Sequence, residues 1–333
     1  MKIRLLIATA DRDYTDHLSN AILKRYADTL ELSVCSSTER LVDLTSANRY
    51  DAALIEPDFV SAVKPGSVQV PFMLMDEMEY GAGSGEMKSI RKYQRISSMA
   101  GQVMESCAET GKGAGGAGAY KAQVTAVWSP AGGAGKTTVA LAYAANKVNA
   151  GKTVVYLNLE NFCSTPVYFP ESGRSISKAL EKLESNLRLF LLGIRQQDSG
   201  SGVLYFCGPD NYDDINVLTA GDIEKLIDAC ADEIDELVVD LSSQVDERVV
   251  KVFGMSEKVL LVADPSKASQ AKTRQFISQH NVFGQIQPKT VLVNNKGASL
   301  PVEQIDKTIM LPHVQANDPI SVFKTLSGSR ADW

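Results

Sequence analysis

The sequence contains few of the residues that build metal sites and disulfide frameworks. Its 333 residues include three histidines and five cysteines, and no two cysteines stand in a CxxC pair. Scattered cysteines in odd number do not suggest a disulfide framework, and the histidines and cysteines together do not suggest a zinc site. This usage is typical of a protein kept in the reducing cytoplasm.

Blocks of basic residues and long apolar runs are absent too. The chain has 34 Lys and Arg against 40 Asp and Glu, a formal net charge of -6, so we do not expect nucleic acid as the main partner. No uncharged apolar run reaches the ~20 residues of a membrane-spanning helix. The first residues, MKIRLLIATADRD, break into acidic residues without a cleavage site of small residues. We therefore expect no direct membrane insertion, and any membrane contact would come through a partner.

What the sequence does contain is enough apolar material for two domains, since 44% of its residues are hydrophobic. The clearest boundary is the stretch ETGKGAGGAGAYK at residues 109–121, where small residues dominate and apolar periodicity stops. We predict one domain at residues 1–108, a linker at 109–121 and a second domain at 122–333.

Apolar strand patterns alternate with amphipathic helix patterns in both halves. In the first half, strands are expected at 2–8, 30–36, 51–57 and 70–75, with a helix at 16–30. In the second half, strands are expected at 122–129, 152–159, 203–208, 235–242, 258–264, 289–295 and 309–312, and helices at 136–150, 220–231, 267–280 and 302–307. This alternation predicts an α/β protein with two doubly wound parallel-sheet domains.

Residues 127–148, VWSPAGGAGKTTVALAYAANKV, contain most of a phosphate-binding loop between a strand and a helix. The strict pattern would have glycine at position 130, where this chain has Pro130. A glycine-rich turn that only joins strand to helix is the alternative, but a lysine followed by two threonines at the first helical turn favours nucleotide binding. The predicted nucleotide-binding residues are Gly132, Gly133, Ala134, Gly135, Lys136, Thr137 and Thr138. Thr137 is also predicted to bind Mg2+.

Polar residues at the ends of two other strands complete the predicted site. Asp240 follows the apolar run 237–239 and could hold Mg2+ through water, although an aspartate that only caps a strand is common. Asn158 and Glu160 lie on one face at the end of the strand after the loop helix. Glu160 could orient or deprotonate a water molecule, whereas Asn158 can hydrogen-bond but cannot act as a base.

These motifs resemble those of the MinD/ParA group of P-loop ATPases over residues 121–328. The group's loop usually reads K-G-G-x-G-K-T-T and its next strand ends D-x-D, whereas this chain has A-G-G-A-G-K-T-T and N-L-E. Ala131 thus stands where the group's signature lysine would be, and Asn158 where its first aspartate would be. The resemblance implies ATP and Mg2+ as cofactors and a homodimer. The missing lysine, which in the group reaches the partner's phosphates, implies slow hydrolysis at most.

Residues 202–230 and 235–273 are similar to the CpaE/TadZ branch of this group, which joins an atypical ATPase domain to a receiver-like domain. This resemblance implies a scaffold that places type IVb (Flp, or Tad) pilus machinery, with secretion-machinery proteins or a polar marker as partners. It implies a cytoplasmic protein that a partner brings to the cell pole. The wider group would place Asn294 and Pro312 on either side of the adenine, and a plain strand end and turn are the alternatives.

The first half matches a receiver domain by strand order more than by motif. Asp11 and Asp13 follow the first strand, Glu56 stands at the phosphoacceptor position, Asp76 follows the fourth strand and Lys92 is the candidate lysine. Glu56 already carries negative charge, so we expect a domain fixed in one state or a docking module. A flavodoxin-like domain kept for packing is the alternative.

Two other functions are alternatives to the predicted scaffold. One is an active ATPase of the MinD/ParA type that positions division, flagellar or plasmid components, against which Ala131, Asn158 and the acidic balance argue. The other is a response-regulator-type signalling protein, against which Glu56 argues.

The short apolar stretch 187–194 is expected to be a core or dimer helix.

Overall fold

The structure is a computed structural model that divides into two compact units. It describes residues 2–27, 29–76, 87–110, 122–170, 173–181, 183, 187–232, 234–316, 318–329, 331 and 333. Unit 1 comprises Met1–Ala117 with Glu184–Gly193, and unit 2 comprises Gly118–Leu183 with Ile194–Trp333. Most of the predicted linker lies outside the described residues.

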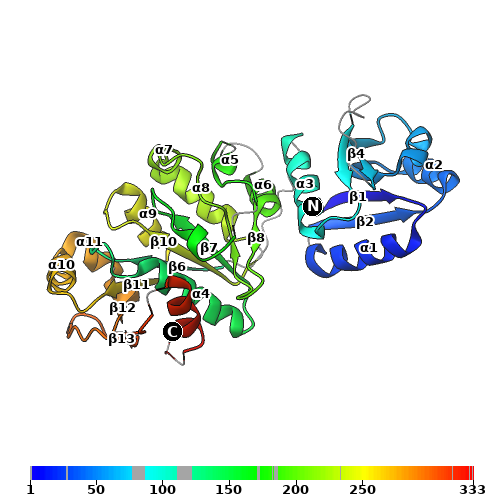
Figure 1. Cartoon of the computed structure of the whole chain (residues 1–333). Coiled ribbons are helices and arrows are strands. Elements are labelled where there is room, and N and C mark those ends of the chain that lie inside the picture. The colour runs from blue at the N-terminus through cyan, green and yellow to red at the C-terminus, as the bar shows by residue number, and fades with distance from the viewer. Residues whose placement is uncertain are drawn as a thin grey trace. The chain divides into compact units, whose positions relative to one another are not determined.

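Unit 1 is built on a parallel sheet in the order β2-β1-β3-β4-β5 (Figure 1). This order is that of flavodoxin-like doubly wound sheets, whose strand order reverses between β1 and β3. The elements are β1 Ile3–Ala8, α1 Arg12–Tyr26, β2 Leu30–Cys35, α2 Thr38–Ala47, β3 Tyr50–Ile55, the 3-10 helix η1 Pro57–Ala62, β4 Val68–Met75, β5 Lys88–Arg91 and α3 Ile96–Glu109.

Helices cover both faces of this sheet because its buried strands carry apolar side chains on both sides. On one face Leu5 and Ile7 pack with Leu18 of α1 and Val103 of α3. On the other face Leu6 and Ala8 pack with residues of α2 and η1. Because β1, β3, β4 and β5 are parallel, their carboxyl ends meet along one edge of the sheet.

Unit 2 contains an eight-stranded sheet in the order β13-β12-β11-β6-β10-β7-β9-β8, parallel except for β8. Its strands are β6 Gln123–Trp128, β7 Val154–Leu159, β8 Gln196–Gln197, β9 Leu204–Tyr205, β10 Glu236–Leu241, β11 Lys258–Ala263, β12 Thr290–Asn294 and β13 Lys307–Met310. Its helices are α4 Lys136–Asn149, η2 Thr165–Val167, α5 Ser177–Leu180, α7 Asp213–Asn216, α8 Ala220–Cys230, α9 Glu247–Met255, α10 Lys267–Ile277, α11 His280–Ile286, η3 Gln287–Lys289 and α12 Pro319–Ser327.

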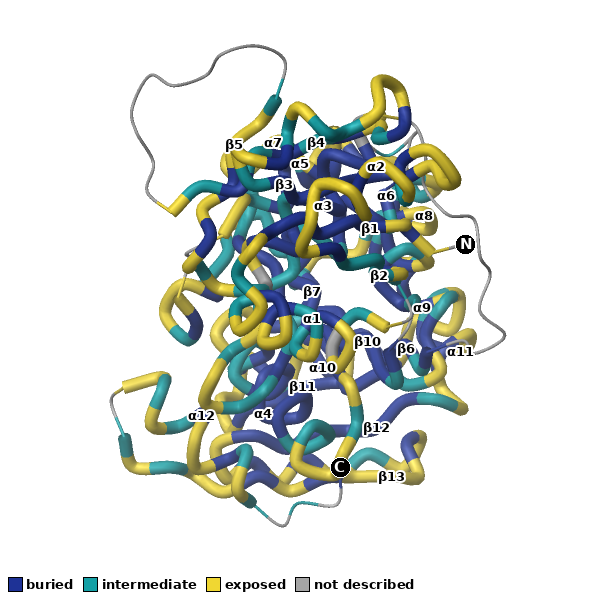
Figure 2. The backbone as a smooth tube through the Cα atoms, turned by 90° about the vertical axis from the view of Figure 1, so that its right-hand side faces the viewer, coloured by how far each residue is buried: buried dark blue, intermediate teal, exposed yellow. Residues whose placement is uncertain are grey.

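The central strands of unit 2 are buried along almost their whole length (Figure 2). Val127 of β6 packs on the face covered by α4 and α12. The next residue, Trp128, points to the opposite face and contacts Phe253 of α9 and Phe276 of α10. Because helices lie on both faces, unit 2 is doubly wound, and the predicted α/β fold class is confirmed for both halves of the chain.

Two sequence expectations differ from the structure. The helix expected at 302–307 is absent from those residues, which are described throughout, and β13 begins at Lys307. The apolar stretch 187–194 forms α6 Leu187–Ile194, but its residues up to Gly193 belong to unit 1 and not to the domain expected at 122–333. Leu189 and Leu192 pack into the core of unit 1.

Glycines allow α6 to cross α3 backbone to backbone within unit 1. A Cβ atom added to Gly193 would lie 3.0 Å from the carbonyl oxygen of Gly101, and one added to Gly101 would collide with the carbonyl of Gly193. Backbone atoms on both sides cannot move aside as flexible side chains can. The crossing therefore requires glycine at position 101.

We expect Gly101→Ala to lower the free energy of unfolding by ~1–3 kcal/mol, the usual cost of overpacking. This loss should exceed the gain of up to ~1 kcal/mol that alanine brings to a helix interior. Gly254→Ala in α9 is the matched control, because no described atom beyond its chain neighbours and the adjacent backbone of its own helix lies within 4 Å of its added Cβ. Urea unfolding followed by circular dichroism should move the two variants in opposite directions. A Gly101→Ala variant as stable as the parent would contradict the tight crossing.

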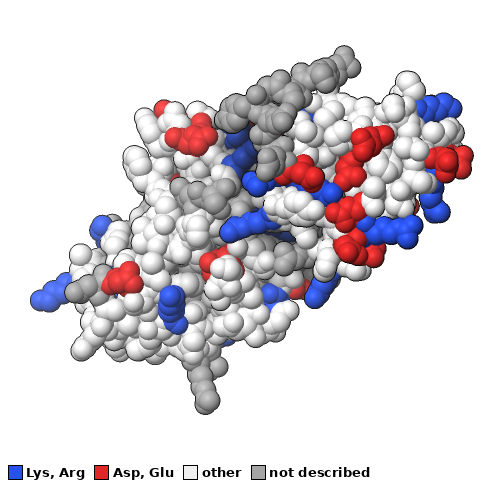
Figure 3. All heavy atoms as spheres, turned by 45° about the vertical axis from the view of Figure 1, so that its right-hand side comes forward, with Lys and Arg blue, Asp and Glu red and all other residues white. Residues whose placement is uncertain are grey.

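Two surface properties bear on partners. Among the described helices, none combines the length and the apolar character that crossing a membrane requires. On the face shown in Figure 3, Lys and Arg side chains lie among Asp and Glu side chains, and most of the described surface carries neither. On this face, charge of one sign does not gather into a broad field.

Candidate functional site

The loop between β6 and α4 has the backbone of an anion-binding turn. Gly133 and Gly135 adopt left-handed φ angles of 76° and 90°, which glycine tolerates without strain. Gly135 then caps α4, so the positive end of the helix dipole faces the loop. Pro130 does not prevent the turn, since the N–H of Ala131 donates to Ser129 Oγ at 3.2 Å. Ala131 itself is buried in the core of unit 2.

Lys136 is buried at the start of α4 and is held by two polar partners. Its Nζ lies 3.2 Å from Glu160 Oε1 and donates to Ser243 Oγ at 3.1 Å. Thr137 Oγ1 donates to the other oxygen of Glu160 at 3.4 Å. The residues that would hold phosphate and Mg2+ thus share one carboxylate, and Glu160 occupies both of them in this state.

Sheet register brings Asp240 to the same place. Asp240 of β10 lies directly opposite Asn158 of β7, and both strands end at the edge where α4 begins. Asp240 is fully buried, and burial followed by the negative charge of Glu160 raises its pKa well above the usual range. The structure therefore brings together four predicted residues, Lys136, Asn158, Glu160 and Asp240.

Tyr156 is a contributor to the site that sequence reasoning missed. Its hydroxyl donates to Asp240 Oδ2 at 2.9 Å and accepts from Asn158 Nδ2 at 2.9 Å. The Oδ1 atom of Asn158 accepts from the N–H of Glu160 at 2.8 Å, and its Nδ2 lies 3.4 Å from Asp240 Oδ2, so Asn158 links the Asp240 carboxylate to the backbone of Glu160. Tyr156 was not predicted because the strand VVYLNL looks apolar in the sequence. The signal that could have identified it is its position two residues before Asn158, on the same face of the strand.

The donor set fits a divalent cation. Asp240 Oδ1 is buried and has no hydrogen-bond partner among the described residues, an arrangement that calls for a ligand or a water molecule. The hydroxyl of Thr137 and the carboxylate of Asp240 are oxygen donors, which Mg2+ prefers. The same Tyr156 and Asn158 that fix Oδ2 leave Oδ1 free to face such a cation through water.

The remaining predicted residues lie around the loop with different degrees of engagement. Thr138 Oγ1 shares a 2.7 Å hydrogen bond with Tyr168, so its hydroxyl is already partnered. Asn294 is buried, with its amide nitrogen 3.4 Å from Met310 Sδ and its oxygen accepting from the N–H of Leu300. Pro312 is exposed and lies two residues after Met310, the last residue of β13, which pairs with Asn294 of β12. The side chains that contact the loop from just beyond β12 are those of the next two residues, Asn295 and Lys296.

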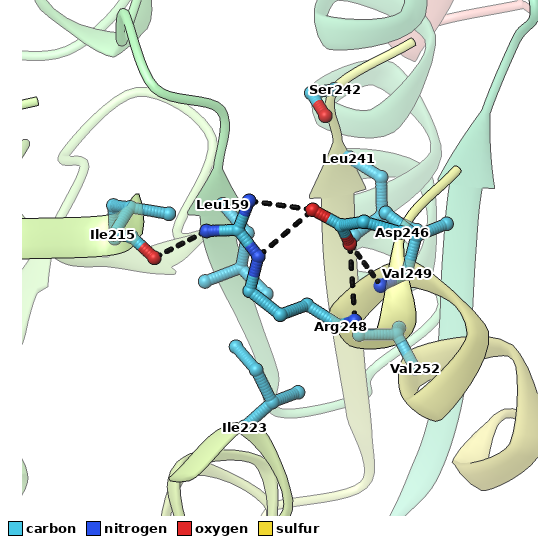
Figure 4. A pocket seen from close by; sticks show the side chains of 9 residues that line it. All are labelled: Leu159, Ile215, Ile223, Leu241, Ser242, Asp246, Arg248, Val249 and Val252. Atoms are coloured by element: carbon cyan, nitrogen blue, oxygen red, sulfur yellow. Dashed lines mark hydrogen bonds and ion pairs between the residues drawn. The ribbon is translucent and has the colours of Figure 1, made fainter. Parts of the chain in front are cut away.

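A small cavity of about 10 Å³, roughly room for one water molecule, adjoins the ends of β7 and β10 (Figure 4). Arg248 closes it, donating to Asp246 Oδ2 and to the carbonyl oxygen of Ile215. Figure 4 shows the guanidinium turned toward these two partners. The cavity is too small for a nucleotide, and Arg248 is committed to holding α7 against α9.

Unit 1 has its own polar cluster at the carboxyl ends of its strands. Lys92 Nζ lies 2.7 Å from Glu56 Oε1, 3.2 Å from Asp11 Oδ2 and 3.7 Å from Asp76 Oδ1. Burial acts to lower the pKa of Lys92, but its hydrogen bonds to Glu56 and Asp11 outweigh burial and raise it. Four of the five predicted residues therefore meet, while Asp13 lies exposed on α1.

Glu56 has no oxygen to spare for phosphoryl transfer. Oε1 is paired with Lys92, and Oε2 accepts from the N–H of Ala10 at 2.9 Å. Burial acts to raise the pKa of Glu56, yet these hydrogen bonds keep its pKa below the usual value. The cluster is a closed ion-pair network in which a lysine ammonium occupies the centre.

We expect no covalent adduct when the protein is incubated with acetyl phosphate and Mg2+ and then weighed intact by mass spectrometry. The reason is that both oxygens of Glu56 are engaged, and its side chain is one methylene longer than the aspartate of a phosphoacceptor. A stoichiometric adduct in the parent that disappears in Glu56→Gln would contradict this expectation.

No protein-family model and no curated protein sequence matches the chain. Among solved structures, a ParA family ATPase from Chlorobium tepidum is similar, with 20% identity and a TM-score of 0.50 over 63% of this chain and 93% of that chain. The septum site-determining protein MinD from Pyrococcus horikoshii, complexed with Mg-ADP, is similar at 14% identity and a TM-score of 0.46, over 62% of this chain and 94% of that chain. With its loop, sheet order and helices on both faces, unit 2 has the fold of the ParA-type P-loop ATPases.

Proposed function

We propose that unit 2 binds ATP with Mg2+. The observation that carries this proposal is the assembly of buried Lys136 and Asp240 with half-buried Thr137 and Glu160, beside a loop with two left-handed glycines. Lys136 would reach the outer phosphates, and the loop N–H groups would bind phosphate oxygens. Thr137 and Asp240 would hold Mg2+, which supplies neutralisation of phosphate charge when bound.

We infer that hydrolysis is slow. Position 131, where the related ATPases carry a lysine, holds a buried alanine, so the loop supplies Lys136 alone as its own cation. Transition-state charge on a transferring phosphoryl group is stabilised by such cations. Glu160 is the residue suited to orient or deprotonate water, with Asn158 holding its backbone N–H.

The cellular role that we propose is a localisation scaffold for type IVb (Flp/Tad) pilus secretion machinery. It is supported by the resemblance of residues 202–230 and 235–273 to the CpaE/TadZ branch. The closed network around Lys92 supports a unit 1 that docks partners in one fixed state instead of switching. The proposed assembly is a homodimer in the cytoplasm that a pilus protein or a polar marker holds at the cell pole.

The test combines light scattering with imaging. Nucleotide favours a dimer only as far as it binds the dimer more tightly than the monomer. We therefore expect a dimer that ATP-Mg2+ strengthens modestly, and fluorescent foci at the pole that persist in a Glu160→Gln fusion. A monomer under all conditions, or foci that vanish when only hydrolysis is blocked, would favour an active MinD/ParA-type ATPase.

A further inference from the structure

Two consecutive side chains beyond β12 bind two consecutive carbonyl groups of the phosphate-binding loop. Asn295 Nδ2 donates to the carbonyl oxygen of Ala134 at 2.9 Å, and Lys296 Nζ donates to that of Gly133 at 2.7 Å. Asn295 is buried, whereas Lys296 is exposed. Both contacts lie within unit 2 and join segments more than 160 residues apart.

The backbone that presents these side chains is strained and firmly held. Lys296 has a φ of 55°, and it is the residue other than glycine, among those described, with a positive φ. A residue with a side chain is strained in this region and keeps this conformation only where the surroundings enforce it. Three hydrogen bonds enforce it here, from the N–H groups of Asn295, Gly297 and Ala298 to Ala263, Leu311 and Asn295 respectively.

Holding these carbonyls also fixes the N–H groups that would bind phosphate. A trans peptide is planar, so its C=O and N–H point in opposite directions. The carbonyl of Gly133 shares a peptide with the N–H of Ala134, and the carbonyl of Ala134 shares one with the N–H of Gly135. Lys296 and Asn295 thus orient two of the loop's donors from behind.

The fit of Asn295 against the loop is close. A Cβ atom added to Gly135 would lie 2.5 Å from Asn295 Nδ2. Glycine is therefore required at position 135 twice, for its left-handed backbone and for the approach of this amide. A contact that constrains both partners in this way is built into the fold.

We propose that Asn295 and Lys296 form a clamp that preorganises the phosphate-binding loop, and that Lys296 adds a second positive charge beside it. This inference rests on the proposed binding of ATP-Mg2+. The charge matters because Ala131 provides none and Lys136 is already paired with Glu160. Asn295 and Lys296 act as positioning residues, since their contacts are to the loop backbone.

The test uses calorimetric titration of ATP-Mg2+ into the full-length chain at low and high salt, with thermal unfolding of the nucleotide-free protein. We expect Asn295→Ala to weaken binding about tenfold, because a buried hydrogen bond to the loop is lost. Lys296→Gln should weaken it about threefold at low salt and less at high salt, since the charge is exposed and screened. Lys272→Gln, which removes an exposed charge on α10, is the matched control and should bind as the parent does.

Lys296→Gly separates the clamp from a role in folding. Glycine adopts the left-handed backbone without strain, so the nucleotide-free variant should melt no lower than the parent, while its affinity for ATP should fall. Affinities equal to that of Lys272→Gln in all three clamp variants, or losses of affinity that only follow lowered melting temperatures, would overturn the clamp. A parent that binds no ATP-Mg2+ would instead overturn the proposed function.

Discussion

Lys136→Ala is expected to weaken ATP binding by at least ~1.5–3 kcal/mol, or about 10- to 100-fold, the range of a hydrogen bond to a charged group. Lys136 is 8% exposed at the start of α4, so its ammonium acts where water screens it little. When nucleotide binds, Lys136 must give up its ion pair with Glu160 to contact phosphate. Any measured affinity already includes the free-energy cost of breaking that ion pair. Calorimetry with ATP-Mg2+ gives the dissociation constants directly.

Removing Lys136 also leaves Glu160 without its 3.2 Å ion-pair partner, so the fold of the variant needs a check by circular dichroism. Lys136→Gln fills more of the same space without the charge and should lose a comparable part of the affinity. Lys272→Ala on the surface of α10 controls for net charge. Parent-like affinity in both Lys136 variants would refute the assignment of this loop to phosphate.

Much of the site was predictable because parallel strands end at one edge of a sheet. Once a strand precedes the loop and two others end in polar residues, Lys136, Glu160 and Asp240 must lie near one another. In unit 1, the strand-order match to a receiver domain placed Glu56 and Lys92 together, and they form a 2.7 Å ion pair. Strand order therefore predicted which charged groups lie close together at the ends of the strands.

Register and local backbone were beyond that reasoning. Tyr156 reaches Asp240 only because Asn158 pairs with Asp240 across β7 and β10, and sequence does not give this pairing. Asn294 and Asn295 are adjacent, and a shift of one residue exchanges the inner and outer faces of a strand. The structure engages Asn294 internally and turns Asn295 to the loop.

Tertiary context decided the other differences. The stretch 187–194 is apolar on most sides, which predicts burial but not the surface that buries it. Packing of Leu189 in unit 1 settles that choice. At 302–307 the apolar residues have helical spacing, but six residues nucleate a helix poorly, and pairing of β13 with β12 begins at Lys307.

Glu160→Gln is expected to lower the already slow ATP hydrolysis by a further ~10²–10⁴-fold, the usual contribution of a positioned acid or base. Glutamine keeps the size of the side chain and the backbone N–H that Asn158 holds, but it cannot accept a proton from water. Conversion of bound ATP to ADP in quenched single-turnover reactions measures the effect without interference from product release.

The same substitution should leave ATP binding intact or make it tighter by a few-fold. In this state Glu160 pairs with Lys136 and accepts from Thr137, so it competes for the two residues that nucleotide and Mg2+ need. A neutral amide competes less for a lysine ammonium. Glu224→Gln, which removes the charge of an exposed glutamate paired with Lys251, is the matched control and should change neither quantity. Hydrolysis that survives Glu160→Gln at the parent rate would show that another residue positions the water, and weaker binding would show that Glu160 supports the nucleotide instead of competing with it.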